Sequence, residues 1–202
     1  MGNSIKHIFQ DWKINQDTSF KSRLALLLFR LVQATKSLPI YLSWITLLFR
    51  GIYQLFVEWV LGIELPWDTQ VGENLKLHHG VALVVNHKTI IGDNCVLRHS
   101  TTIGNKKLSD GSASASPNIG NNVDIGSNVV IIGPISVGNN SVIGAGSVVI
   151  KDVPPNTVVV GNPARVVRTL ESVHSPSVSS EELNVLELES ASGRSVTNDS
   201  QS

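Results

Sequence analysis

The stretch from Ile119 to Lys151 reads IGNNVDIGSNVVIIGPISVGNNSVIGAGSVVIK, and one of its positions recurs every six residues. An aliphatic side chain fills that position each time, at Ile119, Ile125, Ile131, Val137, Ile143 and Val149. A short fixed period with an apolar anchor is typical of a parallel β-helix built from hexapeptides. The spacing fits neither the period of about 3.6 residues of an amphipathic helix nor the alternation of about 2 residues of a half-buried strand.

In such a solenoid each hexad forms a short strand and a turn, and three hexads complete one coil of a triangular prism. A sandwich of Val/Ile-rich strands is the ordinary alternative. It would need polar residues alternating along the strands and hairpin spacing, and the sequence has neither. The predicted fold class is therefore mainly β, a hexapeptide-repeat parallel β-helix.

The same register continues towards the N-terminus. Its inward positions there are Leu65, Val71, Leu77, Val85, Ile91, Leu97 and Ile103. Two extra residues interrupt it beside His78-His79-Gly80, and ten extra residues separate Ile103 from Ile119. We expect 105–117 to leave the prism as a loop, and loops on a rigid scaffold commonly carry function.

The chain is predicted to have three parts: a helical segment over 1–61, the β-helix over 62–170 and a tail over 171–202. The repeat stops at Pro154-Pro155, after which we expect a last strand, a turn at Gly161-Asn162-Pro163 and a short closing element. The tail is rich in serine and acidic residues without sustained periodicity, a composition typical of disorder.

Whole-chain composition excludes some classes of function. The 202 residues have a formal net charge of zero, so nothing points to nucleic acid. The single cysteine, Cys95, rules out an internal disulfide and fits a reducing compartment, and its place in the repeat predicts core packing. The first twelve residues lack the continuous apolar core of a secretion signal. We expect a cytoplasmic protein.

Two helices are predicted in the N-terminal segment, Thr18–Lys36 and Ile40–Leu61, with Arg30 outside or at the edge of the first. Thirteen uncharged residues separate Lys36 from Arg50, fewer than the roughly twenty that a membrane span needs. One alternative is a helical cap packed on the end of the solenoid. The other is a helix pair over 18–61 lying on the cytoplasmic face of a membrane, because residues 1–61 carry seven Lys/Arg against three Asp/Glu.

Stacking of equivalent hexads, about 4.8 Å apart, brings a set of chemically distinctive residues into line. The inward residues of one face are Leu77, Leu97, Ile125 and Ile143. The residues two places after them form what we call the histidine column: His79, His99, Ser127 and Ala145. A thin ligand such as acetyl-coenzyme A could lie along the small residues and present its thioester to the histidines. Each histidine alone could be a solvated turn residue, but two in one column, beside an interruption, favour a site.

The segments LHHG, RHSTTIGN and IGAGSVVIKDVPPNTVVVGNPARVV carry a family resemblance. They are similar to the hexapeptide-repeat acyltransferases of the serine acetyltransferase family, and residues 20–170 resemble most closely its colanic-acid-biosynthesis O-acetyltransferases. The resemblance implies a left-handed β-helix, acetyl-coenzyme A as co-substrate with no permanently bound cofactor or metal, and a homotrimer with active sites between subunits.

The resemblance also assigns residues. His79 falls on the family's catalytic histidine, which acts as general base, and Glu64 falls on its orienting aspartate, with Asp68 as the substitute. His78 replaces the family's aspartate before the catalytic histidine, and His99 is a further active-site candidate. The positions that match the family's coenzyme contacts are Gly104, Ser127, Ala145, Lys151 and Arg165.

The predicted acceptor is a hydroxyl group, of a sugar in polysaccharide biosynthesis or, alternatively, of serine in cysteine biosynthesis. The family's serine enzymes have Arg-His where this chain has Ala115 and Ser116, and neither of these can clamp a carboxylate. Ser116 is instead a candidate for contact with the acceptor. We therefore favour the sugar.

Two other classes stay open. A zinc hydratase resembling the γ-class carbonic anhydrases would need three histidines and an open position. His78, His79, His87 and His99 supply the number but not the characteristic spacing. A non-catalytic solenoid scaffold is the second alternative, and coenzyme A binding would argue against it.

Overall fold

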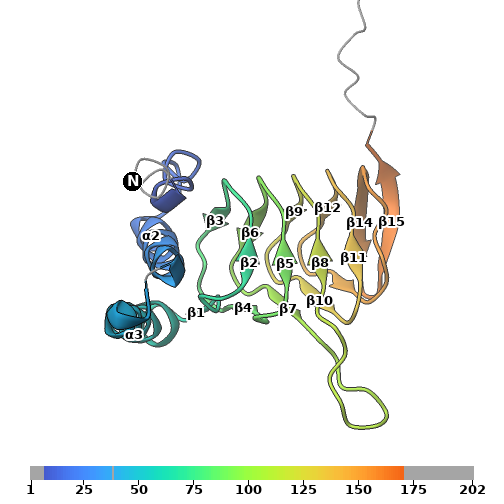
Figure 1. The fold of residues 1–202 in the computed structure, drawn as a ribbon. Coiled ribbons are helices and arrows are strands. Elements are labelled where there is room, and N and C mark those ends of the chain that lie inside the picture. Colours follow the sequence, from blue (N-terminus) through green and yellow to red (C-terminus); the bar gives the residue numbers. More distant parts are fainter. Residues whose placement is uncertain (1–6, 38, 171–202) are drawn as a thin grey trace, which may run out of the picture. The chain divides into compact units, whose positions relative to one another are not determined.

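The computed structural model describes residues 7–37 and 39–170, and its dominant feature is a solenoid of short parallel strands (Figure 1). The first sheet contains β1 (Ile63–Glu64), β4 (Leu83–Val85), β7 (Thr102–Gly104), β10 (Val130–Ile132) and β13 (Val148–Val149). The second contains β2 (Gln70–Val71), β5 (Ile90–Ile91), β8 (Asn118–Ile119) and β11 (Ser136–Val137). The third contains β3 (Lys76–His78), β6 (Val96–Arg98), β9 (Asp124–Ile125), β12 (Val142–Ile143), β14 (Thr157–Gly161) and β15 (Ala164–Thr169).

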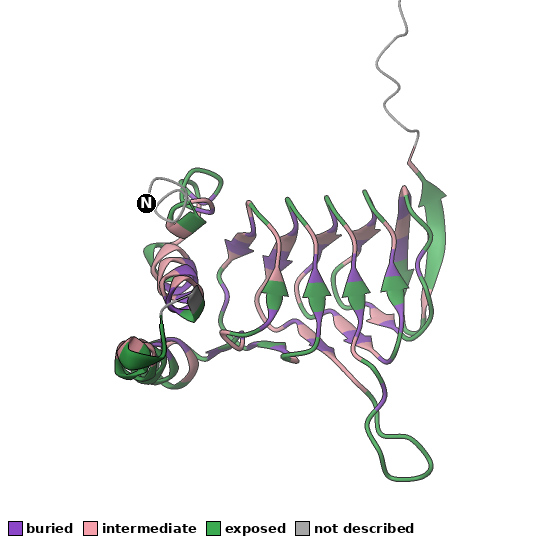
Figure 2. Ribbon diagram, in the orientation of Figure 1, coloured by how far each residue is buried: buried purple, intermediate pink, exposed green. Residues whose placement is uncertain are grey.

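The register confirms the predicted parallel solenoid with three hexads to a coil. Leu77 pairs with Leu97, and Ile125 pairs with Ile143, each from one coil to the next. The inward aliphatic residues are buried, whereas the outer positions of the strands are exposed or half-buried (Figure 2). Cys95 is buried, as predicted, and its Sγ donates to the carbonyl of Gly120 at 3.1 Å.

Asparagines line the corner between the second and third sheets. Asn74, Asn94, Asn122, Asn140 and Asn156 all have φ between 55° and 58°, in the left-handed region that asparagine tolerates better than most residues. Their side-chain amides bond from coil to coil, for example from Asn140 Nδ2 to Asn156 Oδ1 at 2.9 Å. The corner therefore turns tightly and keeps its amides hydrogen-bonded.

The two predicted helices form, with altered ends. The first is α2 (Phe20–Ala34), followed by the 3₁₀ turn η1 (Thr35–Ser37), and Ser19 caps it by accepting from the N–H of Ser22 at 3.2 Å. The second begins with η2 (Ile40–Leu42), continues as α3 (Ser43–Tyr53) and ends in a π-helical stretch, η3 (Gln54–Val60). By length and composition alone, Ile40–Val60 could cross a membrane.

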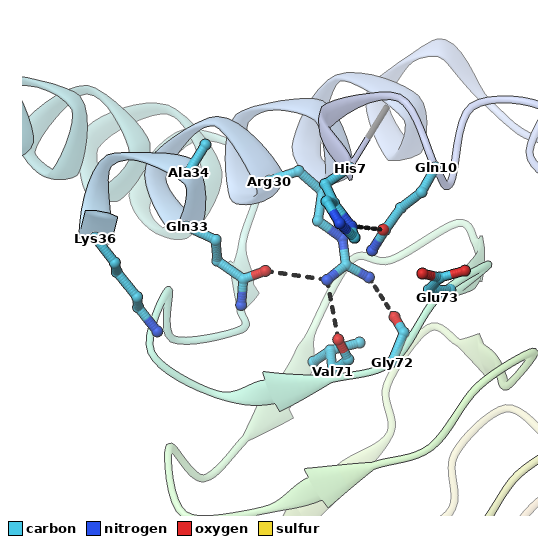
Figure 3. A pocket seen from close by; sticks show the side chains of 9 residues that line it. All are labelled: His7, Gln10, Arg30, Gln33, Ala34, Lys36, Val71, Gly72 and Glu73. Atoms are coloured by element: carbon cyan, nitrogen blue, oxygen red, sulfur yellow. Dashed lines mark hydrogen bonds between the residues drawn. The ribbon is translucent and has the colours of Figure 1, made fainter. Parts of the chain in front are cut away.

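The prediction that Arg30 lies outside or at the edge of α2 is wrong, because this side chain is 5% exposed. Its guanidinium donates to both carboxylate oxygens of Asp11. It also donates to the carbonyls of Val71 and Gly72 at the open edge of the first coil (Figure 3). Asn15 completes this clamp. Its Nδ2 donates to the carbonyl of Leu75, just before β3, and its Oδ1 accepts from the N–H of Leu77 in β3. The N-terminal segment thus satisfies the backbone groups that an open strand edge would expose.

The interruption after β7 leaves the prism as predicted (Figure 1). Within it Lys107 and Ala113 form an antiparallel bridge, and the N–H of Ser114 donates to the carbonyl of Lys106 at 2.8 Å. At the far end β14 turns through 161–163 and pairs with β15 antiparallel, which is the predicted closing element. The predicted disorder of 171–202 concerns residues outside the described part of the chain.

Candidate functional site

His79 lies in the turn between β3 and β4, where the repeat gains its two extra residues. Its φ is 55°, its carbonyl accepts from the N–H of Val81, and its side chain is exposed. In the next coils the left-handed residue comes three places after the inward residue, at Ser100, Asn128 and Gly146. The register of β4 with β7 places Ala82, at φ 57°, in that position of the interrupted turn. His79 is therefore an additional left-handed residue, which the interruption introduces.

A hollow of about 280 Å³ adjoins His79. Its lining comes from the start of α2, from the entry to the solenoid and from the interrupted turn: Ser19, Lys21, Ser22, Leu61, Ile63, His79, Gly80 and Val81. Gly80 lets the turn pack closely on the core, because an added Cβ would lie 2.7 Å from Cδ2 of Leu77 and 3.0 Å from Cδ1 of Ile63. The hollow thus has mostly apolar walls, with a histidine and the cation of Lys21 on them.

The rest of the histidine column follows along the same corner, between the third and first sheets. His99 is half-buried, with Nδ1 3.4 Å from Oγ of Ser100. Beside Ser127, Gly126 packs closely on the next coil, since a Cβ added to it would come within 2.6 Å of the backbone nitrogen of Ala145. The side chains of the column thus become smaller along the solenoid, from two imidazoles to Ser127 and Ala145, so a ligand could approach the backbone at the small residues.

His78 is a half-buried neighbour of His79 on β3, in register with Arg98. Burial lowers the pKa of His78, and the positive charges of Lys76 and Arg98 lower it further. This imidazole is therefore neutral at neutral pH, unlike the aspartate that it replaces in the family pattern.

Glu64 is exposed on β1, in register with Val84. Within 7–37 and 39–170 no hydrogen bond or ion pair joins Glu64 to His79, so its role as the orienting carboxylate stays a prediction. Asp68, the substitute, is also exposed. A carboxylate not singled out from the sequence lies near Glu64: burial, and then the charge of Glu64, raises the pKa of Glu58. Its only signal in the sequence is an acid inside an apolar run.

The remaining predicted residues lie at a different corner, between the first and second sheets. Gly104 ends β7, Lys151 follows β13, and Ser116 precedes β8 with its Oγ donating to Oδ1 of Asn86 at 2.9 Å. One chain does not bring these residues to the histidine column. Lys151 and Arg165 do share a hollow of about 230 Å³ at the last coil, and no ion pair in the described part of the chain occupies either side chain.

Another hollow, of about 450 Å³, lies away from these residues, between α2 and the second sheet (Figure 3). Arg30 stands in its wall, but its donors are engaged by Asp11, Gln33, Val71 and Gly72. We interpret this hollow as part of the clamp. For the zinc alternative, no three potential ligands gather among the residues described in one chain, so its histidines would have to meet across copies.

Comparison with known proteins adds to this geometry. The family model described as "Bacterial transferase hexapeptide (six repeats)" matches residues 116–151. The protein named "Putative colanic acid biosynthesis acetyltransferase WcaB" of Escherichia coli (strain K12) is 43% identical over 115 residues, which cover 57% of this chain and 69% of that relative. "Serine acetyltransferase 2" of Arabidopsis thaliana is 37% identical over 112 residues, 55% of this chain and 34% of the longer plant protein.

Solved structures are similar as well. The crystal structure of Neisseria gonorrhoeae serine acetyltransferase aligns with a TM-score of 0.68 and 28% identity, over 88% of this chain and 69% of that one. The same enzyme in complex with serine aligns with a TM-score of 0.68 and 29% identity, over 83% of this chain and 70% of that one. The similarity thus covers the solenoid and reaches into the helical segment.

Proposed function

Because this chain belongs to the hexapeptide-repeat acetyltransferases of the serine acetyltransferase and WcaB type, we propose that it transfers an acetyl group from acetyl-coenzyme A to a sugar hydroxyl. Acetyl transfer is common to these relatives. The proposal itself concerns the acceptor, the residues that act on it, the homotrimer and the location of the protein. We propose a cytoplasmic location, because a free cysteine such as Cys95 suits a reducing compartment.

The observation that supports the choice of a sugar is that the two positions where the family's serine enzymes have Arg-His hold no cation here, although Lys21 does stand in the wall of the His79 hollow. Ala115 is apolar, and Ser116 donates its hydroxyl to Asn86. Arg98, the nearest guanidinium to the histidines in sequence, forms an ion pair with Asp124 and donates to the carbonyl of Ile125 at 3.0 Å. A saccharide needs neutral hydrogen-bonding groups, whereas a pocket selective for serine must hold a carboxylate or an ammonium group.

In the proposed reaction the acceptor hydroxyl approaches His79 from the hollow. The imidazole removes the hydroxyl proton as the oxygen attacks the thioester carbonyl, a step in which a positioned base contributes typically about 10² to 10⁴-fold. The C–S bond breaks, coenzyme A leaves as the thiolate, and the proton held by His79 returns to the sulfur. The products are the O-acetylated acceptor and coenzyme A.

The donor would bind across two subunits. Ser127 and Ala145 offer a narrow corner for the pantetheine arm, and Lys151 and Arg165 offer two cations for phosphate groups. Because Gly104 and Lys151 lie at another corner than the histidine column, a neighbouring copy would complete each site. This supports the homotrimer that the family resemblance implies.

Exchange of the acceptor residues tests the proposal against its alternative, a serine acetyltransferase. In Ala115→Arg with Ser116→His, we expect acetylation of saccharides to stay the same or fall and turnover of serine to rise, measured as release of coenzyme A. A variant with unchanged serine turnover and faster sugar acetylation would contradict the assignment of these two positions to the acceptor.

A further inference from the structure

The helix from Ile40 to Val60 presents large apolar side chains to the outside, and we propose that this outer face docks on the surface of a membrane containing anionic lipid. The docking itself is independent of the acetyl acceptor. Only the further step, that the sugar acceptor is carried on a lipid, rests on the proposed function. The outer face comprises Ile40, Tyr41, Trp44, Leu47, Leu48, Leu55, Phe56, Trp59 and Val60, all between 47% and 87% exposed.

The composition of the outer face suits a lipid surface. An exposed apolar area of this extent is unusual on a protein that stays in water and marks an interaction site. Tyr41 and Trp44 lie near one end of the helix, and Phe56 and Trp59 lie near the other. Aromatic and aliphatic residues along one face are typical of helices that bury that face at the boundary between head groups and acyl chains.

The opposite face is packed, which favours a helix lying on the membrane over one crossing it. Tyr53 is 1% exposed and donates its hydroxyl to the carbonyl of Leu65 at 2.5 Å, and Val57 is fully buried. The Tyr53 ring lies against Phe29 of α2, with centroids 6.2 Å apart. A helix that crossed the bilayer would have to give up these contacts with the protein, whereas one in the interface keeps them.

The helical segment carries two exposed basic residues that suit anionic head groups, Lys36 just before Ile40–Val60 and Arg50 within it. Lys36 Nζ and Arg50 Cζ lie 4.9 Å and 4.4 Å from the ring centroid of Trp67. No carboxylate in the described residues pairs with either of them. A lysine or arginine near an anionic surface typically contributes about 1 kcal/mol to binding. The acidic residue of Ile40–Val60, Glu58, is half-buried, and burial raises its pKa. The exposed charges of the segment are therefore basic, which favours an anionic lipid surface over an uncharged apolar partner.

The outer face ends at the candidate active site. Val60 is followed directly by Leu61, which lines the hollow of His79. Phe20, 65% exposed, lies between two residues of that lining, and Val81 of the lining is itself 53% exposed. With the helix in the interface, the hollow would open beside the head groups. A saccharide on a lipid carrier could then place a hydroxyl at His79 while its lipid stays in the bilayer.

Vesicle flotation with the full chain tests the docking. We expect the protein to bind vesicles of phosphatidylcholine mixed with phosphatidylglycerol and to bind phosphatidylcholine alone more weakly. Trp44→Glu with Trp59→Glu should weaken binding by about tenfold or more, because the buried apolar area is lost. Lys36→Gln should weaken binding to the anionic vesicles by about fivefold. Val167→Glu is the matched control, since Val167 is 59% exposed on β15, away from the helix, and should bind like the unmodified chain.

Absence of vesicle binding by the unmodified chain would overturn the docking, as would equal losses in Val167→Glu and in the tryptophan variant. It would also be overturned if the tryptophan substitutions changed only the oligomeric state in solution, because the face would then contact a second copy. Assays with soluble saccharides keep the two proposals separate. Acetylation of soluble sugars without vesicle binding would leave the proposed function standing, whereas vesicle binding without acetyl transfer to any saccharide would overturn the function alone.

Discussion

The open strand edges at the two ends of the solenoid are hydrogen-bonded by different groups. At the first coil the open strand edge is satisfied by side chains, those of Asp11, Asn15 and Arg30. At the last coil the edge is satisfied by backbone, because β15 folds back antiparallel on β14. A few buried side chains therefore stabilise the first end, whereas a distributed ladder of backbone bonds stabilises the last.

The candidate functional residues also differ between the two ends of the solenoid. The first end carries His79 in a left-handed turn beside an apolar hollow. The last end carries Lys151 and Arg165 around a second hollow, with neither cation in an ion pair among the described residues. The comparison predicts that substitutions at the first end change catalysis or folding, whereas substitutions at the last end change affinity for the donor.

His79→Ala should have the largest effect. Loss of the proposed base should lower kcat/KM for acetyl transfer by about 10² to 10⁴-fold, and affinity for coenzyme A should stay within a few-fold. His7→Ala is the matched control, since His7 is an exposed histidine away from the histidine column that hydrogen-bonds Gln10, and its loss should leave turnover unchanged. Near-native turnover by His79→Ala would refute the assignment and turn attention to His78 and His99.

Arg30→Ala tests the clamp at the first end. It leaves the buried carboxylate of Asp11 without its cation and frees the carbonyls of Val71 and Gly72, so the free energy of unfolding should fall by about 3–5 kcal/mol. Arg168→Ala removes an exposed arginine from β15, where we expect a change within about 0.5 kcal/mol. Equal losses in denaturant unfolding would show that the two ends do not differ in the way described.

Lys151→Ala and Arg165→Ala should weaken coenzyme A binding by about tenfold or more each, the effect of losing a hydrogen bond to a charged group. Titration calorimetry would measure this, and kcat at saturating donor should change little. Ile150→Ala, in the same hollow but uncharged, separates loss of charge from loss of packing. Unchanged affinity in both charge variants would move the phosphate contacts elsewhere.

The smallest effect is expected from deletion of 171–202. No residue of that segment continues the repeat, so the melting temperature and the acetyl-transfer rate should be nearly unchanged. Thermal unfolding and an activity assay of the shortened chain would check this. A drop of several degrees would indicate that the LNVLEL stretch docks on the solenoid.

The periodic part of the molecule could be predicted from the sequence because each hexad repeats one local rule. The register and the loop over 105–117 follow from counting six residues at a time. The same counting sets His79 in line with His99, but the interrupted turn places Val81 there on the side of the first sheet. The clamp could not be predicted in this way. Arg30 and Asp11 are nineteen residues apart, and Asn15 bonds to residues about sixty positions away, in a segment without period. The left-handed conformation of His79 likewise depends on how the two extra residues of the turn fold.

The choice of acceptor is the central claim, and competition between acceptors tests it most directly. Release of coenzyme A by the full, unmodified chain would be followed with acetyl-coenzyme A and either free serine or nucleotide-linked and lipid-linked saccharides. We predict slow or undetectable acetylation of serine and faster transfer to a saccharide. Efficient acetylation of serine, with a KM of about 1 μM to 1 mM as for ordinary substrates, would contradict the account.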